Sequence, residues 1–187
     1  MAKPKIAVIV GSIREGRNAD KVLNWFKGAV KDNQNAELEY LDLRDYPMPL
    51  YADSDKVRYR EGKHPNPDVQ KWLDKIGAAD GFVIITTEYN RGYPASLKNA
   101  IDYGSKEWFE KPLGFVAYGG FAGGARAVEQ LRQVAGELRM YDVRDMVIIP
   151  HVWAAFDEQG NLPNSEANVK NANLMLDKVA ELAVKLK

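Results

Sequence analysis

The sequence lacks cysteine and has only two histidines, and both shortages exclude kinds of chemistry. Without cysteine the chain can form no disulfide framework, thiolate nucleophile or cysteine-based metal site. His64 and His151 are far apart and form neither an HxH nor an HxxxH pair. We therefore expect no metal site and no metal-dependent catalysis.

The sequence also lacks an excess of charge and a long apolar run. Lys plus Arg and Asp plus Glu both number 26, so the formal net charge is zero. This balance gives no broad field to attract nucleic acid or an anionic membrane, and it weakly favours self-association. No apolar run approaches the roughly 20 residues that a membrane span needs. The N-terminus leads straight into a strand-like run without a signal peptide, so we expect a cytoplasmic protein.

Short apolar runs alternate with amphipathic stretches along the whole chain. The runs that predict strands cover residues 6–10, 38–43, 82–85, 113–117 and 143–149. Apolar residues at helical spacing predict helices over residues 22–30, 69–76, 97–101, 127–138 and 175–186. Continuous apolar strands separated by helices indicate a parallel sheet covered on both faces. We expect an α/β fold over residues 1–187, a single domain with a five-stranded parallel sheet in the order 2-1-3-4-5 and three α/β/α layers.

Residues 47–67 interrupt this alternation with four prolines, tyrosines and many charges. They predict a long loop between the second strand and its helix. Such a loop is often functional or lies at an interface, although a mobile surface segment explains the composition equally well. Tyr51 and Tyr59 in this loop could cover the ligand of a partner subunit.

The predicted strand order places a ligand where the first and third strands diverge. In an open parallel sheet, ligands bind outside the carboxyl ends of the strands at such a switch point. The loops that follow these strands are residues 11–18 and 87–94, and residues 118–124 follow the neighbouring strand. We therefore expect the functional site among these three loops.

The loop over residues 11–18 has the composition of an anion site. It joins a buried strand to a helix N-terminus, which offers unpaired N–H groups and a positive dipole end. The residues that could serve an anion are Gly11, Ser12, Arg14, Arg17 and Asn18. The loop matches neither GxGxxG nor GK[ST], so a single phosphate monoester fits better than a dinucleotide pyrophosphate or ATP. An ordinary turn with solvent-facing arginines is the alternative.

The other two loops suit a flat ring. Exposed amides after the third strand can bond the edge of a planar heteroaromatic, and Tyr89 and Tyr93 can supply apolar surface. Glu88 could cap a turn or accept a bond from a ring N–H. Four glycines in residues 118–124 let the backbone approach a ligand, although plain flexibility would explain them as well.

Three motifs in these loops give the chain a resemblance to a known family. They are residues 11–17, residues 88–90 followed by 97–102, and residues 118–120. In order and spacing the chain resembles the NADPH-dependent FMN reductase family of flavodoxin-like proteins, which includes quinone, azo-dye and chromate reductases. The resemblance covers residues 5 to 150. Thr87 replaces a common proline, and Arg17-Asn18 replaces a common Ser-x-Asn.

The resemblance implies a set of cofactor contacts. Residues 11–18 would hold the FMN phosphate, through Gly11, Ser12, Arg14, Arg17 and Asn18. The isoalloxazine would meet mainly backbone at Thr87, Glu88, Tyr89, Asn90 and Arg91. Its other edge would be lined by Tyr118, Gly119 and Gly120. The family also implies a homodimer or homotetramer with FMN near a subunit boundary.

The resemblance further implies an enzyme that oxidises NADPH or NADH. A hydride would pass from the nicotinamide to flavin N5, and the flavin would then reduce a second acceptor in a ping-pong mechanism. The acceptor could be free flavin, a quinone, an azo compound or a metal oxyanion. No catalytic side chain is needed. The alternative is a flavodoxin-type electron carrier serving protein partners, but such carriers are usually acidic.

Several other polar and aromatic residues are expected to be structural. Lys98 and Asp102 lie four apart on a short helix and should pair there. Trp108 and Phe109 should pack in the core or at an interface. His151 follows the fifth strand, and we expect a structural role for it as well.

Overall fold

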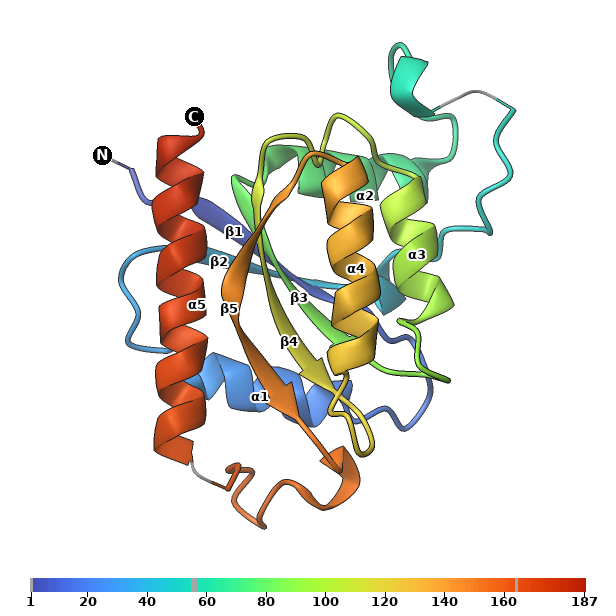
Figure 1. The fold of residues 1–187 in the computed structure, drawn as a ribbon. Helices are drawn as coiled ribbons and strands as arrows, with labels where there is room; N and C mark the ends of the chain where they lie inside the picture. Colours follow the sequence, from blue (N-terminus) through green and yellow to red (C-terminus); the bar gives the residue numbers. More distant parts are fainter. Residues whose placement is uncertain (1, 55–56, 164) are drawn as a thin grey trace.

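The strands form one parallel sheet in the order β2-β1-β3-β4-β5 (Figure 1). The computed structural model describes residues 2–54, 57–163 and 165–187. The strands are Lys5–Val10 (β1), Glu37–Asp42 (β2), Gly81–Thr87 (β3), Pro112–Tyr118 (β4) and Tyr141–Ile149 (β5). All neighbouring pairs are parallel, so their carboxyl ends meet at one edge. The predicted fold class and strand order are confirmed.

Helices cover both faces of the sheet (Figure 1). They are Ala19–Ala29 (α1), Pro67–Ala78 (α2), Ala95–Asp102 (α3), Ala125–Glu137 (α4) and Ser165–Lys185 (α5). One apolar cluster joins the sheet to α1 and α5, and a second joins it to α2, α3 and α4. The molecule therefore has three layers, as the alternation of apolar runs predicts.

Alternate residues of β1 enter opposite clusters. Ile6 and Val8 pack toward α1 and α5, whereas Ala7 and Ile9 pack toward the other helices. All four side chains are fully buried. Because both faces of the strand are covered, no polar face is needed, and the strand is a continuous apolar run.

Most predicted boundaries differ from the structure by one to three residues, and one differs by more. Helix α5 begins at Ser165, ten residues before the apolar stretch that predicted it. Its first part is mostly polar and attaches to the end of α1 partly through hydrogen bonds, since the Asn173 side chain donates to the Ala29 carbonyl at 2.9 Å. Strand β5 begins at Tyr141, two residues earlier than predicted.

The segment over residues 47–67 is largely irregular, as predicted, but its start is attached to α3. The Asn99 side chain accepts a bond from the Tyr51 amide at 2.8 Å and donates to the Pro49 carbonyl at 2.8 Å. A 3-10 helix spans Val57–Tyr59, and α2 begins at Pro67. Residues 55–56 lie outside the described residues.

The residues expected to be structural behave largely as predicted. Lys98 and Asp102 form an ion pair at 2.6 Å on α3. Trp108 is buried with its ring centroid 4.7 Å from that of Phe82.

No described helix is long and apolar enough to cross a membrane.

Candidate functional site

Three loops meet at the carboxyl edge of the sheet, at the lower end of the ribbon in Figure 1. We name them the phosphate loop (residues 11–18), the turn loop (residues 87–94) and the glycine loop (residues 118–124). The Ser12 hydroxyl hydrogen-bonds to that of Tyr89 at 2.8 Å, which joins the first two loops. The Glu88 amide donates to the Tyr118 carbonyl at 3.1 Å, which joins the turn loop to the glycine loop. The switch-point loops predicted from sequence are therefore in contact.

The phosphate loop presents unpaired donors. In the described structure, the backbone amides of residues 15–18 have no hydrogen-bond acceptor. Helix α1 begins directly after Asn18, whose side chain makes no capping bond. The Arg14 side chain is exposed and has no acidic partner among the described residues. Free amides, a helix N-terminus and one open guanidinium suit a phosphate monoester.

Arg17 lies behind this loop. Its side chain is 1% exposed and donates to Asp42 at 2.9 Å, to Asp20 at 2.6 Å, and to the Ser12 carbonyl. Burial alone would lower the pKa of Arg17, but the hydrogen bonds to Asp42 and Asp20 outweigh it and hold the pKa above its usual value. The Arg17 guanidinium is therefore occupied by carboxylates and by the loop backbone, whereas Arg14 is available.

Three hydroxyl groups form a cluster where the loops meet. Ser12 is buried and bonds to Tyr89, and its side chain also bonds to the Tyr118 hydroxyl. Burial raises the pKa of Tyr118, which the hydrogen bonds from Ser12 and Thr87 only partly offset. Tyr118 is therefore a neutral hydrogen-bonding group here and not a base.

Glu88 fastens the turn loop to α4. Its carboxylate accepts from the Arg126 side chain at 2.9 Å and from the Arg126 amide at 3.3 Å, so it caps the first turn of that helix. This is the first of the two roles that the sequence allowed for Glu88. Arg126 was not predicted as a site residue, because no local sequence signal shows that it lies opposite Glu88.

Backbone donors of the other two loops remain open. In the described structure, the amides of Asn90, Arg91 and Gly120 have no acceptor. Thr87 and Tyr118 are buried, and Gly119 leaves little room, since an added Cβ would lie 3.2 Å from the Gly124 nitrogen. Open amides over a closely packed backbone suit the polar edge of a planar ring.

An aromatic group beside the glycine loop was not predicted. The His151 ring lies between Phe121 and Trp153, with centroid distances of 6.3 and 5.6 Å. The His151 amide donates to the Gly120 carbonyl at 3.0 Å, which holds the group against the loop. Phe121 is 84% exposed and Trp153 is 65% exposed. The sequence signals were only an aromatic residue within the glycine loop, Phe121, and another two residues after His151, Trp153.

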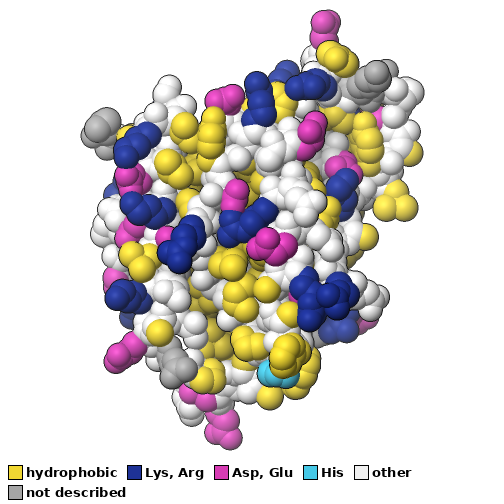
Figure 2. Space-filling model, in the orientation of Figure 1, with side chains coloured by type: hydrophobic (Ala, Val, Ile, Leu, Met, Phe, Trp, Pro, Cys, Tyr) yellow, Lys and Arg dark blue, Asp and Glu magenta, His cyan; other side chains and the backbone are white. Residues whose placement is uncertain are grey.

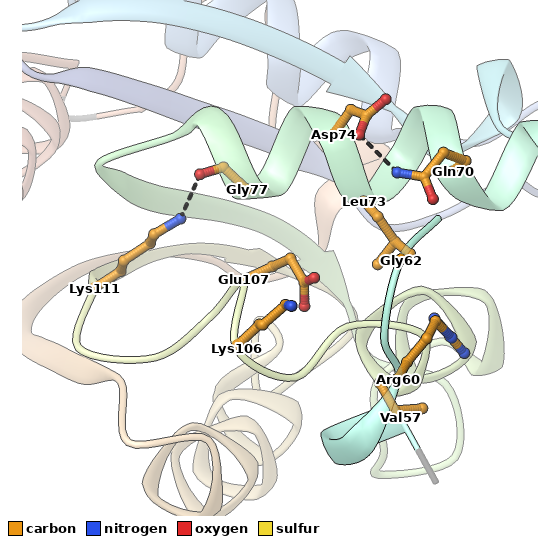
Figure 3. A pocket seen from close by; sticks show the side chains of 10 residues that line it. All are labelled: Val57, Arg60, Gly62, Gln70, Leu73, Asp74, Gly77, Lys106, Glu107 and Lys111. Atoms are coloured by element: carbon orange, nitrogen blue, oxygen red, sulfur yellow. Dashed lines mark hydrogen bonds between the residues drawn. The ribbon is translucent and has the colours of Figure 1, made fainter. Parts of the chain in front are cut away.

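A different hollow lies at the opposite edge of the sheet (Figure 3). It measures about 490 Å³ and lies between α2 and the segment that leads into β4. Lys111 donates there to the carbonyls of Ile76 and Gly77 at 2.9 and 3.0 Å, and burial lowers the pKa of Lys111 to about 8. These contacts close the end of α2. No group of metal-ligating side chains occurs among the described residues, there or elsewhere.

Comparison with known proteins gives a consistent family. The model of the NADPH-dependent FMN reductase family matches residues 4–154. An NAD(P)H-dependent FMN reductase of Schizosaccharomyces pombe is 41% identical over 73% of this chain and 68% of its own length. An NAD(P)H:quinone oxidoreductase of Solanum tuberosum is 32% identical over 98% of this chain and 94% of its own.

Solved structures share the fold. The flavoenzyme NAD(P)H:(acceptor) oxidoreductase FerB of Paracoccus denitrificans aligns with a TM-score of 0.72 and 24% identity, covering 97% of this chain and 98% of FerB. The azoreductase AzrA aligns with a TM-score of 0.53 and 17% identity, covering 97% and 99%. At these identities the similarity shows a common flavodoxin-like architecture.

Proposed function

This chain belongs to the NADPH-dependent FMN reductase family, and we propose that its three loops hold FMN for electron transfer from NAD(P)H to a small acceptor. The family makes the chain an oxidoreductase that uses FMN and a reduced nicotinamide dinucleotide. What carries the proposal for the site is the set of open amides over residues 15–18, directly before α1 and beside the exposed Arg14.

The residues present fit FMN. Its single phosphate suits the phosphate loop, where amides, the α1 N-terminus and Arg14 would bind it. Its ring edge suits the open amides of Asn90, Arg91 and Gly120. Arg17 would act from behind by holding the Ser12 carbonyl, and Glu88 would hold the turn loop against α4.

The flavin supplies the redox chemistry when bound, by accepting a hydride from NAD(P)H and giving electrons to an acceptor. The protein residues would position and cover the ring, and the proton that a quinone takes up together with the hydride would come from solvent. Tyr118 keeps its hydroxyl proton, since burial holds its pKa above the usual value. NAD(P)H and the acceptor would use the same open face of the flavin in turn, which gives a ping-pong mechanism.

We propose a homodimer or homotetramer built from one flavodoxin-like FMN-binding domain over residues 1–187. Large apolar side chains are exposed around the candidate site, and Figure 2 shows hydrophobic side chains gathered around a histidine at the lower edge of the molecule. The exposed side chains are Phe121 and Trp153 beside His151, and Ile13 and Leu50, which line one hollow together. A second copy covering this edge would place each flavin near a subunit boundary.

The names of two relatives suggest which electron acceptors to assay. The Schizosaccharomyces pombe protein is named an FMN reductase and the Solanum tuberosum protein a quinone oxidoreductase. For this chain we propose small oxidants of these two kinds, with azo compounds and metal oxyanions as further candidates to assay.

The first test is a visible spectrum of protein purified without added flavin. We expect flavin bands that bleach when NADPH is added without oxygen and return when a quinone follows. Bands that persist under NADPH and NADH would indicate an electron carrier. A colourless protein that also fails to take up FMN would disprove the cofactor site.

The mechanism is tested by initial rates at varied NADPH and quinone. A ping-pong scheme gives parallel double-reciprocal lines. Intersecting lines would show that both substrates bind together. They would reject alternate use of one site by NADPH and the quinone, while leaving the FMN site in place.

A further inference from the structure

The tip of the turn loop has an unusual backbone. Tyr89 and Gly92 exchange backbone hydrogen bonds, with the Tyr89 amide to the Gly92 carbonyl at 2.8 Å and the reverse bond at 3.0 Å. The two residues between them are left-handed, with φ of 50° at Asn90 and 72° at Arg91. This is the geometry of a two-residue hairpin turn whose second position usually holds glycine. An arginine there is strained, and strain of this kind points to a function of the side chain.

The turn is fixed in place by α4. The Arg91 carbonyl accepts a bond from the Gln130 side chain at 3.0 Å. Gly92 packs closely on the same side chain, because an added Cβ would lie 3.3 Å from Gln130 Oε1. The root of the Arg91 side chain is therefore held at a defined point on the wall of the site, and the side chain itself is exposed.

Most other arginines at this edge are already neutralised. Arg17 is paired with Asp20 and Asp42, and Arg126 is paired with Glu88. Within the three loops as the structure describes them, only Arg14 and Arg91 have a guanidinium without an acidic partner. They lie on different loops, so they can serve two different anions.

We propose that Arg91 binds the 2′-phosphate of NADPH and makes the enzyme prefer NADPH to NADH. This inference rests on the proposed function, in which FMN occupies the site and its phosphate lies at Arg14. FMN has one phosphate, whereas NADPH brings a second monoester that NADH lacks. An exposed guanidinium on a second loop, without an acidic partner in the described structure, is a group that can recognise such a dianion.

The experiment compares holoenzyme with Arg91→Ala and Arg91→Lys. We expect Arg91→Ala to raise KM for NADPH roughly tenfold, the effect of one lost charged hydrogen-bonding partner, and to change KM for NADH much less. Arg91→Lys keeps the charge and should recover part of the preference. Binding of 2′,5′-ADP to the holoenzyme, compared with that of 5′-AMP in calorimetric titrations, reports the phosphate contact without turnover, and the tighter binding of 2′,5′-ADP should be lost in Arg91→Ala.

The matched control is Arg144→Ala, an exposed arginine on β5 outside the three loops, which should leave both KM values as they are. Equal changes in KM for NADPH and NADH would overturn the inference, as would an unchanged 2′,5′-ADP advantage. Loss of FMN from Arg91→Ala would also overturn it, since the side chain would then serve the flavin. If wild-type protein binds no FMN, or neither dinucleotide bleaches it, the proposed function fails first.

Discussion

Two arginines of the phosphate loop stand three residues apart in opposite surroundings. Arg14 is exposed, whereas the Arg17 side chain is 1% exposed between two carboxylates. A buried charge that loses its partners is expensive, and so is a buried carboxylate that loses its cation. The two residues should therefore affect stability and phosphate binding in different proportions.

Arg17→Ala should lower the unfolding free energy of the apoprotein by about 3 kcal/mol, because it leaves Asp42 half-buried without its main cation. FMN affinity should fall with it, since the Ser12 carbonyl loses its donor. Urea unfolding and fluorescence titration with FMN measure the two effects. Arg14→Ala is the control: it should weaken FMN binding and change stability by less than about 0.5 kcal/mol. If Arg17→Ala and Arg14→Ala lowered the unfolding free energy equally, the buried Arg17 would have no special structural role.

The Arg17–Asp42 pair also predicts how stability depends on acid. Burial would raise the pKa of Asp42, but hydrogen bonds from Arg17 and Arg44 lower it to about 2 from 3.8. The folded pKa lies below the unfolded one, so the contribution is complete above about pH 4 and is lost as the pH falls toward 2. We expect the stability difference between wild type and Asp42→Asn to shrink across that interval in urea titrations. Asp32→Asn, an exposed site without a cationic partner in the described structure, should show a difference that does not vary in this way.

The burial of Arg17 is the kind of fact that the sequence could not supply. A loop arginine before a helix N-terminus looks like an anion ligand, and the same holds for Arg14. What separates them is Asp42, which pairs in register with Val10 at the end of β1. That register comes from the pairing of β2 with β1. The pattern of residues along the chain does not show which carboxylate will lie against which arginine.

At the scale of elements, the prediction succeeded where burial dictates the pattern. The central strands β3 and β4 are buried at every position, and their apolar runs show it directly. The predicted α5 is too short because the first ten residues of the helix are mostly polar and their few apolar residues give only a weak helical periodicity. The aromatic group at His151 was missed because Phe121 and Trp153 come from two different loops that only the fold brings together.

The start of α4 provides a test of the glycine loop. Gly124 has φ of 91°, and an added Cβ would lie 2.8 Å from both the Ala117 Cβ and the Tyr118 nitrogen. Gly124→Ala must therefore displace the end of β4 or the loop. We expect a loss of about 2–3 kcal/mol, a Tm lower by roughly 5–10 °C and weaker FMN binding. Calorimetry and flavin titration measure these changes.

Gly136 in the last turn of the same helix is the matched control. An added Cβ there meets nothing within 4 Å, and its backbone is helical. Gly136→Ala should raise stability by about 0.5–1 kcal/mol and leave FMN binding unchanged. If Gly124→Ala bound FMN as tightly as this control, the close packing of the glycine loop would have no part in the site.

At the scale of the molecule, three of the four most exposed large apolar side chains lie at the edge that carries the site. Phe121 and Leu50 are more than 80% exposed, and Trp153 is 65% exposed. A net charge of zero offers no long-range repulsion between copies. Apolar side chains gathered beside a ligand site on a neutral surface are typical of an interface.

We expect sedimentation velocity to give a dimer or tetramer for wild type and a shift toward monomer for the double variant Phe121→Asp and Trp153→Asp. The reason is that a charge in the centre of an apolar interface must be desolvated without a partner. Leu174→Asp, at a half-exposed leucine on α5, is the control and should keep the wild-type assembly. A wild type that sediments as a monomer at micromolar concentration would leave the aromatic group open to solvent. Phe121 and Trp153 would then be free to contact the acceptor directly, and their substitution should change KM for the quinone instead of the assembly.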